Sequence, residues 1–338
     1  ILCSFRRLPA FKPTRYTHRM ESNVLPPREK INITELLLKD FDLNPHSSMH
    51  TRGRADYALY CKDFHDIRAA LAWADEQHMP VTILGSATNC VISDRGIPGL
   101  TIITTHLTRC HINGVLFCAR AGMQLDKAIN LSIDAGLAGL EMLGGIPGTV
   151  GGAVFGNAGA GGTTISSHLY YVDWIDRNGE LRRLEAYPED FGNRESPFKH
   201  IDGAIIYEAG FLLHPTKQTA PLRTIKEGAM RTRRANHQFD WPSCGCFFKN
   251  PEGETAGKLI EACGLKGKRI GGAMVSPYHA NFVVNTGEAT SDDLYLLGEE
   301  IRNTVRQQTG VELAYEVHFL GRPSPRITDL QGNPPSRL

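Results

Sequence analysis

The chain has 338 residues, enough for two or three domains that each bury a core. Its 37 Lys and Arg balance 36 Asp and Glu, which excludes a general electrostatic attraction to nucleic acid or to a membrane surface. Its eight cysteines lack the spacing of a disulfide framework, which indicates reduced thiols in a cytoplasmic protein, and no apolar run approaches the roughly 18 residues of a membrane span.

The N-terminal stretch is basic and has no acidic residue before Glu21. It resembles an organelle transit peptide or an over-extended reading frame whose true start is Met20, and we favour the second interpretation. In either case residues 1–30 are expected to be a disordered or non-native extension outside the core.

Periodicity and turn signals predict a mixture of helices and strands along the rest of the chain. In chain order these are helix 64–77, strands 81–84 and 100–104, helix 124–135, strands 169–175, 181–184 and 204–213, helices 225–234, 256–263 and 290–310, and strand 311–319. The Asn178-Gly179 pair between two apolar runs predicts a hairpin. Along strand 311–319 the apolar residues alternate with polar ones, which is typical of a half-buried strand.

A glycine-rich stretch over residues 144–162 is the most unusual part of the sequence. Its glycines at 145, 148 and 151 match neither G-x-G-x-x-G nor a G-x-x-x-x-G-K-[ST] phosphate loop. Free backbone N–H groups leading into a helix are suited to phosphate oxygens. The alternative is a set of tight turns packed in a core. The small-residue turn at 85–89 follows a predicted strand and has a similar character.

Two polar residues have an unremarkable interpretation when they are considered singly. Arg194 lies in a predicted loop and Glu316 on the polar face of a predicted strand, so each is expected to be solvated. Cys244-Gly245-Cys246 suggests a metal or redox role, but no second Cys or His pair follows at zinc-site spacing. We therefore expect no metal.

Nine segments nevertheless occur in an order that resembles a known family. They are Gly145–Gly152, Asn157-Ala158-Gly159, Arg194-Glu195-Ser196-x-Phe198, Gly245-Cys246-Phe247-Phe248-Lys249-Asn250-Pro251, Ala256-Gly257-Lys258-Leu259-Ile260-Glu261, Leu265-Lys266-Gly267, Ile270-Gly271-Gly272-Ala273, His279-Ala280-Asn281-Phe282 and Glu316-Val317. Together they resemble the UDP-N-acetylenolpyruvoylglucosamine reductases (MurB), from about residue 44 to residue 321. The short connection from Phe198 to Ala204 is similar to the family's shorter second type.

The resemblance implies an α/β (α+β) fold with three parts. Two of them are subdomains of an FAD-binding module of the vanillyl-alcohol-oxidase (PCMH) type, expected over 31–104 and 105–215. The third is a C-terminal α/β substrate-binding domain, expected over 216–321, whose last strand returns Glu316 to the flavin. Residues 322–338 are expected to form a tail.

The implied activity is the NADPH-dependent reduction of UDP-N-acetylglucosamine enolpyruvate to UDP-N-acetylmuramate through FAD. This is a step in the synthesis of peptidoglycan precursors in the bacterial cytoplasm. The implied partners are these small molecules, without nucleic acid or membrane, and we expect a monomer.

Candidate site residues are those at positions of this sequence that match functional positions in the family's motifs. The catalytic residues implied by the resemblance are Arg194, Cys246 and Glu316, and Glu316 matches a glutamate that hydrogen-bonds the substrate carboxylate when protonated. Those implied for the cofactor are Gly85, Ser86, Ala87, Thr88, Asn89, Gly145, Ile146, Pro147, Gly148, Thr149, Gly151, Gly152, Asn157, Ala158 and Gly159. Those implied for the substrate are Lys249, Asn250 and Glu261.

The sequence departs from the family pattern in four places. Cys246 replaces the usual proton-donating serine, and a thiol with a reference pKa of about 8.5 is mostly protonated at neutral pH. The first flavin loop reads Gly-Ser-Ala-Thr-Asn over residues 85–89 in place of G-x-G-S-N. Asn193 replaces a tyrosine before the arginine, and Gln238-Phe239 replaces a Gln-Pro pair.

Two other classes of function remain as alternatives. One is an oxidase or dehydrogenase on the same FAD fold, although no marked covalent flavin attachment motif lies near the glycine stretch. The other is a degenerate, non-catalytic nucleotide-sugar binder, against which the retention of both Arg194 and Glu316 argues.

Overall fold

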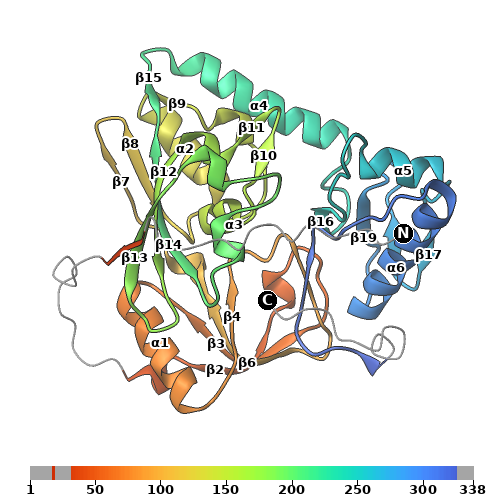
Figure 1. Ribbon diagram of the computed structural model, residues 1–338, viewed down its shortest axis with the longest axis horizontal. Helices are drawn as coiled ribbons and strands as arrows, with labels where there is room; N and C mark the ends of the chain where they lie inside the picture. Colours follow the sequence, from red (N-terminus) through yellow and green to blue (C-terminus); the bar gives the residue numbers. More distant parts are fainter. Residues whose placement is uncertain (1–16, 20–31, 326–338) are drawn as a thin grey trace, which may run out of the picture.

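The computed structural model of the protein describes the backbone of residues 17–19 and all of residues 32–325. Its elements form a first subdomain, a second subdomain built on the widest sheet, and a C-terminal domain, which follow one another in colour order in Figure 1. The fold is the mixed α/β arrangement that the sequence predicts.

The first subdomain is a four-stranded sheet with one helix on a face. Its strands, in spatial order, are β2 (Leu38–Asp42), β3 (Arg54–Tyr60), β6 (Ile97–Ile103) and β4 (Val81–Leu84). Strands β3, β6 and β4 run parallel, so a crossover is needed, and helix α1 (Phe64–Glu76) supplies it. The Asp63 side chain caps α1 by accepting from two backbone N–H groups.

The second subdomain is a six-stranded antiparallel sheet. Its strands, in spatial order, are β1 (Thr17–Arg19), β13 (Leu181–Glu185), β12 (Leu169–Ile175), β14 (Ile205–Leu212), β8 (Leu116–Arg120) and β7 (Cys110–Asn113). Helices α2 (Leu125–Asp134) and α3 (Val150–Phe155) pack on one face through a buried apolar core. The hairpin predicted at Asn178-Gly179 is present, with Gly179 at φ +74°.

Strand β1 corrects one expectation about the N-terminal segment. Sequence analysis expects residues 1–30 to stay outside the fold, yet Thr17–Arg19 pairs with β13 and extends the sheet at its edge. An open sheet edge presents unpaired N–H and C=O groups, so a short passing segment can add to it by backbone hydrogen bonds alone. Residues 1–16 and 20–31 lie outside the described residues.

Helix α4 (Thr219–Ala235) corrects a second expectation. It begins six residues before the predicted helix, and Leu222 packs into the core of the second subdomain. Lys226 Nζ lies 2.8 Å from Asp126 Oδ2 of α2, and Arg223 pairs with Asp134 of the same helix. The boundary expected at residue 216 therefore falls after α4, because Leu222 is buried in the second subdomain and two ion pairs join this helix to α2.

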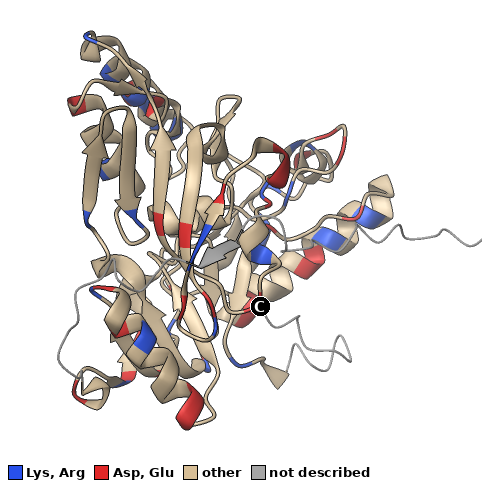
Figure 2. Ribbon diagram, turned by 60° about the vertical axis from the view of Figure 1, so that its left-hand side comes forward, with Lys and Arg blue, Asp and Glu red and all other residues tan. Residues whose placement is uncertain are grey.

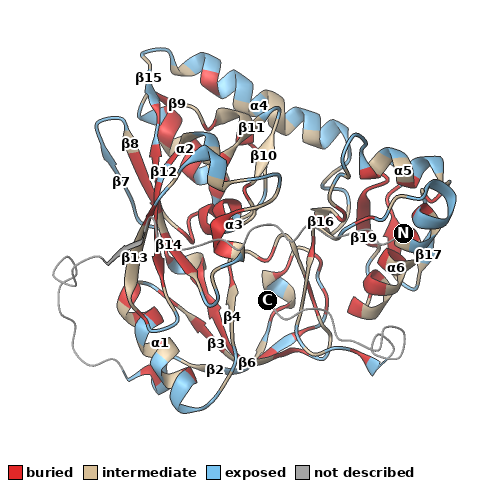
Figure 3. Ribbon diagram, viewed as in Figure 1, coloured by how far each residue is buried: buried red, intermediate tan, exposed pale blue. Residues whose placement is uncertain are grey.

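The C-terminal domain combines a small antiparallel sheet with two helices. The sheet contains β16 (Ser243–Cys246), β19 (Phe282–Asn285), β18 (Ala273–Val275) and β17 (Arg269–Ile270), and the helices are α5 (Ala256–Ala262) and α6 (Ser291–Thr309). Thr290 and Asp293 form a capping box at the start of α6, and Gly310 ends it in the left-handed conformation. Figure 3 shows the buried side of α6 turned toward this domain's core.

The predicted strand over 311–319 is wrong in extent. Only β20 (His318–Leu320) is a strand, and it pairs in parallel with β5 (Cys90–Ile92) of the first subdomain. Upstream, the backbone makes a single isolated bridge, Phe248 to Tyr315, instead of a continuous ladder. The predicted alternation still holds in burial, since Leu313 and Val317 are buried and Glu312 is exposed.

The remaining described elements are short. They include the pairs β9 (Leu137–Ala138) with β15 (His214–Pro215) and β10 (Gly159–Ala160) with β11 (Thr163–Thr164). The start of the expected tail also contacts the fold, because Arg322 pairs with Asp56 at 2.7 Å. Figure 2 shows acidic and basic residues interspersed over all three units. Within the described residues, no helix is both long and apolar enough to cross a membrane.

Candidate active site

A cavity of about 1780 Å³ opens where the three units meet. Its wall is made by the β4–β5 loop, the glycine stretch, the loop after residue 193, the end of β16 and the chain leading into β20. The volume exceeds the roughly 300–1,000 Å³ of a pocket for one small ligand. It can therefore hold a large ligand together with a second one.

All residues of the β4–β5 loop, 85–89, line this cavity. Gly85 is required here because a Cβ would lie 2.6 Å from Thr149 Oγ1. Thr88 Oγ1 donates to the carbonyl of Pro147, so this loop is bonded to the glycine stretch. Asn89 Nδ2 donates to the carbonyl of Glu316 at 3.1 Å, which joins the same loop to the returning C-terminal chain.

The glycine stretch forms the turn that starts α3. Thr149 caps this helix, and its Oγ1 accepts from the N–H of Gly152. The two neighbouring glycines differ in role. A Cβ on Gly151 would lie 2.7 Å from the Cβ of Ala121, whereas a Cβ on Gly152 would meet nothing closer than Thr149 Oγ1 at 3.5 Å. Gly151 is therefore needed for packing, and Gly152 leaves open space beside the cavity.

Most of the residues predicted to contact the cofactor line the cavity. Beyond the β4–β5 loop these are Ile146, Pro147, Gly148, Thr149, Gly151, Gly152, Ala158 and Gly159. Gly145 and Asn157 do not line it. The N–H of Gly145 donates to Asp126 Oδ1, and a Cβ there would lie 3.1 Å from atoms of Met230 and Arg233. Buried Asn157 donates through Nδ2 to the carbonyl of Gly192 at 2.8 Å.

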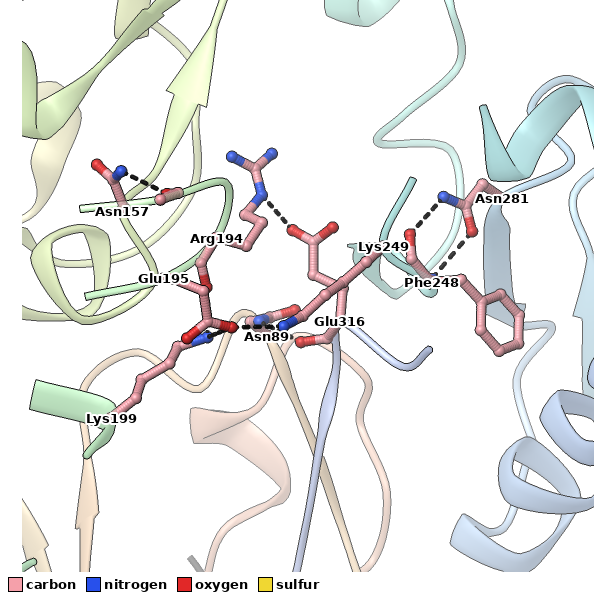
Figure 4. Close-up of polar contacts among 10 residues, drawn as sticks. Asn89, Asn157, Arg194, Glu195, Lys199, Phe248, Lys249, Asn281 and Glu316 are labelled. Carbon is pink, nitrogen blue, oxygen red and sulfur yellow. Dashed lines mark hydrogen bonds and ion pairs between the residues drawn. The ribbon is translucent and has the colours of Figure 1, made fainter. Parts of the chain in front are cut away.

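Arg194 and Glu316 are brought together from the second subdomain and from the chain leading into β20. Arg194 Nε lies 2.5 Å from Glu316 Oε1, and both side chains are largely removed from solvent. Figure 4 shows the two groups facing each other. The sequence predicts both as site residues through the family resemblance, but not that they pair.

Cys246, at the end of β16, lines the same cavity. Burial raises the pKa of its thiol to about 11, and the nearby carboxylate of Glu316 adds to this effect. The cations Arg194 and Arg233 act in the opposite direction but do not cancel it. The thiol is thus protonated at neutral pH.

The three residues predicted to bind substrate are not part of the cavity wall. Lys249 Nζ pairs with Glu195 Oε1 at 2.6 Å. Asn250 Oδ1 accepts from the N–H of Ala256 at the start of α5. Glu261 is exposed on α5 and pairs with Lys266 Nζ at 2.6 Å.

Four charged or titratable residues at the site were not predicted. Glu195 links Lys249 to the second subdomain, and Lys199 Nζ donates to the carbonyl of Arg194 at 2.6 Å. Arg233 and His318 line the cavity. Burial lowers the pKa of His318 to about 4, and Lys199 and Lys249 add to this effect. Arg233 lies in the predicted helix 225–234 and His318 in the predicted strand 311–319. Neither sequence pattern indicates which side chains of these elements face the site.

Comparisons with known proteins identify the family. The model of the UDP-N-acetylenolpyruvoylglucosamine reductase C-terminal domain matches residues 237–320, and that of an FAD binding domain matches residues 55–185. A UDP-N-acetylenolpyruvoylglucosamine reductase from Lactiplantibacillus plantarum is 38% identical over 84% of this chain and 93% of its own length. One from Rubrobacter xylanophilus is 40% identical over 84% of this chain and 95% of its own length. The chain belongs to this family.

A solved structure supports the same assignment at the level of the fold. The crystal structure of UDP-N-acetylenolpyruvylglucosamine reductase (MurB) from Thermus caldophilus has a TM-score of 0.70 and 29% identity to the chain. The alignment covers 84% of this chain and 98% of that one. The match of the C-terminal model from residue 237 also agrees with the boundary after α4.

The residues present fit a flavin dinucleotide. The β4–β5 loop and the start of α3 lie in the range that matches the FAD binding domain. Gly152 leaves the space that a Cβ would otherwise occupy, and the first N–H groups of a helix are suited to phosphate oxygens. The protein is therefore an FAD-dependent oxidoreductase, and the two loops predicted from their small residues are the ones that would hold the cofactor.

Proposed function

We propose that the chain reduces the enolpyruvyl group of UDP-N-acetylglucosamine enolpyruvate to give UDP-N-acetylmuramate, with NADPH as the reductant, in peptidoglycan precursor synthesis. The observation that carries this proposal is the meeting of Arg194, Glu316 and Cys246 in one cavity that the β4–β5 loop and the glycine stretch also line. They come from three separated segments of the chain. When bound, FAD takes hydride from NADPH and delivers it to the substrate.

Arg194 and Glu316 are suited to the carboxylate end of the substrate. Hydride addition at the carbon β to the carboxylate leaves extra negative charge on the carboxylate side, and this charge must be stabilised. The planar guanidinium of Arg194 presents several donors to such a group. Glu316 accepts from Arg194 in the free protein, and when protonated it can donate a hydrogen bond to the carboxylate instead.

Cys246 is the proposed proton donor to the carbon next to the carboxylate. Its thiol lines the cavity and its pKa, raised by burial, keeps the proton in place at neutral pH. The developing charge on the substrate is a stronger base than water, so the proton can be transferred when the substrate carbon lies beside the sulfur. The family's usual serine would hold its proton in the same way.

Lys249 is the proposed cation for the nucleotide part of the substrate, and Asn250 and Glu261 are the other two residues proposed to contact it. In the free protein Lys249 pairs with Glu195 and joins this domain to the second subdomain. An anionic ligand can take over the ammonium from the carboxylate, since both are oxygen anions. We further propose that the protein acts as a monomer in the cytoplasm, where its described cysteines stay free.

The variant Arg194→Ala tests the proposal by separating the two half-reactions. We expect NADPH to reduce the flavin nearly as fast as in the wild type. We expect reoxidation by the enolpyruvyl sugar nucleotide to slow by on the order of 10² or more, the effect of losing one donor to the developing charge. Stopped-flow flavin absorbance under anaerobic conditions measures both rates. Equal loss in both half-reactions contradicts the role given to Arg194.

The same measurement distinguishes the alternatives. An oxidase on this fold would reoxidise rapidly in air and not with the sugar nucleotide. A non-catalytic binder would not be reduced by NADPH, so it would show no bleaching at all. Anaerobic bleaching by NADPH followed by rapid recovery with the sugar nucleotide is the result expected of the reductase.

A further inference from the structure

Arg194 occupies a strained position in a two-residue turn. The N–H of Gly192 donates to the carbonyl of Glu195 at 3.1 Å and the N–H of Glu195 donates back at 3.2 Å. Of the two residues between them, Arg194 has φ +57° and Asn193 does not have a positive φ. A turn with positive φ at its third position normally has glycine there. An arginine in this conformation needs support from the surrounding structure.

Contacts from both sides hold this turn. Asn157 Nδ2 donates to the carbonyl of Gly192 at 2.8 Å, and Ser196 Oγ donates to the carbonyl of Phe155 at 2.7 Å at the end of α3. Lys199 Nζ donates to the carbonyl of Arg194 itself at 2.6 Å, and Figure 4 shows its side chain reaching toward this segment. Lys199 thus bonds directly to the backbone of the strained residue.

The environment of Lys199 is unusual for a lysine. Its side chain is only 12% exposed, and Glu195 Oε1 lies 3.9 Å from Nζ, farther than in a close ion pair. Burial lowers the pKa of the amine. The closest polar contact of the ammonium is therefore a backbone carbonyl, and a charged donor makes a stronger hydrogen bond to it than a neutral one.

We propose that Lys199 is a positioning residue for the reduction of the substrate: its ammonium holds the carbonyl of Arg194, and this fixes the guanidinium toward Glu316 and the cavity. The inference rests on the proposed function. Without the hydrogen bond the backbone of Arg194 relaxes out of its positive φ, and the guanidinium turns away from the place where charge develops.

The test uses the FAD-bound protein and three single variants. Lys199→Met removes the donor but keeps much of the apolar stem, Lys199→Arg keeps a charged donor, and Lys39→Met is a matched change at an exposed lysine in β2. We expect Lys199→Met to slow reoxidation by the sugar nucleotide about tenfold to a hundredfold, the effect of losing a hydrogen bond to a charged group. Reduction of the flavin by NADPH should change less than about threefold. The guanidinium that Lys199 positions makes no hydrogen bond to the substrate carboxylate in that half-reaction. Lys199→Arg should recover part of the rate, and Lys39→Met should behave as the wild type.

A double-mutant cycle decides whether Lys199 acts through Arg194. If it does, adding Lys199→Met to Arg194→Ala causes no further loss in reoxidation rate, because the guanidinium it positions is already absent. If the double variant loses reoxidation rate by the product of the two single-variant factors, the inference is overturned, and Lys199 contacts the substrate itself. Equal losses in both half-reactions for Lys199→Met would also overturn it and indicate a structural role. If Lys199→Met purifies without flavin, Lys199→Gln, which keeps an amide donor, replaces it in the same cycle.

The outcome also separates this inference from the proposed function. If Arg194→Ala leaves reoxidation unchanged, the proposed function fails. If Arg194→Ala slows reoxidation but Lys199→Met does not, only the positioning role of Lys199 fails.

Discussion

Arg194 and Glu316 are 122 positions apart in sequence, yet the Nε of one lies 2.5 Å from Oε1 of the other. The arginine is presented by a strained turn on the second subdomain, and the glutamate by the chain that returns from the C-terminal domain to pair with β5. Their contact joins two units across the wall of the cavity. Under the proposed function, the substrate carboxylate binds beside both side chains, where negative charge develops.

The strain at Arg194 predicts that activity and stability are opposed at this position. Arg194→Gly and Arg194→Ala both remove the pairing with Glu316, so they differ chiefly in the backbone at φ +57°. We expect the glycine variant to be more stable than the alanine variant by about 1 kcal/mol, because only glycine adopts this conformation without a steric cost. Both should slow reoxidation by on the order of 10² or more. Equal unfolding free energies in urea would show that the turn carries no strain.

Replacement of Cys246 should affect product formation and leave flavin reduction intact. We expect Cys246→Ser to keep substantial turnover, because a hydroxyl can hold a proton in the same place. Cys246→Ala should lose about 10²–10⁴ in product formation, the range for a missing general acid. Stopped-flow reoxidation and product analysis measure these effects.

The control for Cys246 is its neighbour Cys244. The thiol of Cys244 is buried and donates to the carbonyl of Cys90. Cys244→Ala should therefore lower the thermal midpoint and leave the reoxidation rate nearly unchanged. A metal or disulfide role would make the two alanine variants equally harmful. Full activity in Cys246→Ala, with normal deuterium labelling of the new C–H bond in deuterated water, would contradict its assignment as proton donor.

The two adjacent glycines of α3 should respond differently to the same change. We expect Gly151→Val to lose stability by about 1–3 kcal/mol, because its side chain would overpack against Ala121. Gly152→Val should fold as the wild type but purify without FAD, because its side chain would fill the open space beside the cavity. The family resemblance implies a cofactor role for both glycines, and the close approach to Ala121 gives Gly151 a packing role as well. Thermal midpoints and flavin absorbance measure the two effects, and a yellow Gly152→Val protein would remove that residue from the cofactor site.

The lowered pKa of His318 predicts that the folded protein loses stability at acid pH. Its pKa is about 4 in the folded protein against about 6.5 for an unperturbed histidine, so between these limits the unfolded chain binds a proton that the native protein does not. The free energy of unfolding therefore decreases as the pH falls through this window. The total decrease is on the order of 3 kcal/mol once the pH is below the folded-state pKa. His318→Gln should flatten the dependence of the unfolding free energy on pH over the same range. An unchanged slope in the variant would show that other groups cause the acid sensitivity.

The sequence alone determined the elements with strong local signals. The residues of α1, α2 and α6 carry an apolar face at helical spacing and recognisable ends, such as the Asp63 and Thr290 caps, so local chemistry specifies them. The two small-residue loops were predicted for the same reason, since only glycine and short side chains allow such turns. The order of the motifs was sufficient to identify the family.

Only the tertiary structure decided how these parts meet. Residues 311–317 alternate like a strand, but no neighbouring strand completes a ladder, so their burial pattern comes from packing and not from pairing. The basic helix α4 belongs to the second subdomain because Leu222 is buried there, which its sequence does not show. Lys199 was not predicted as a site residue because its function depends on the carbonyl of Arg194. Contacts between distant backbone atoms and side chains leave no periodic signal in the sequence, because they are fixed by the packing of the three units.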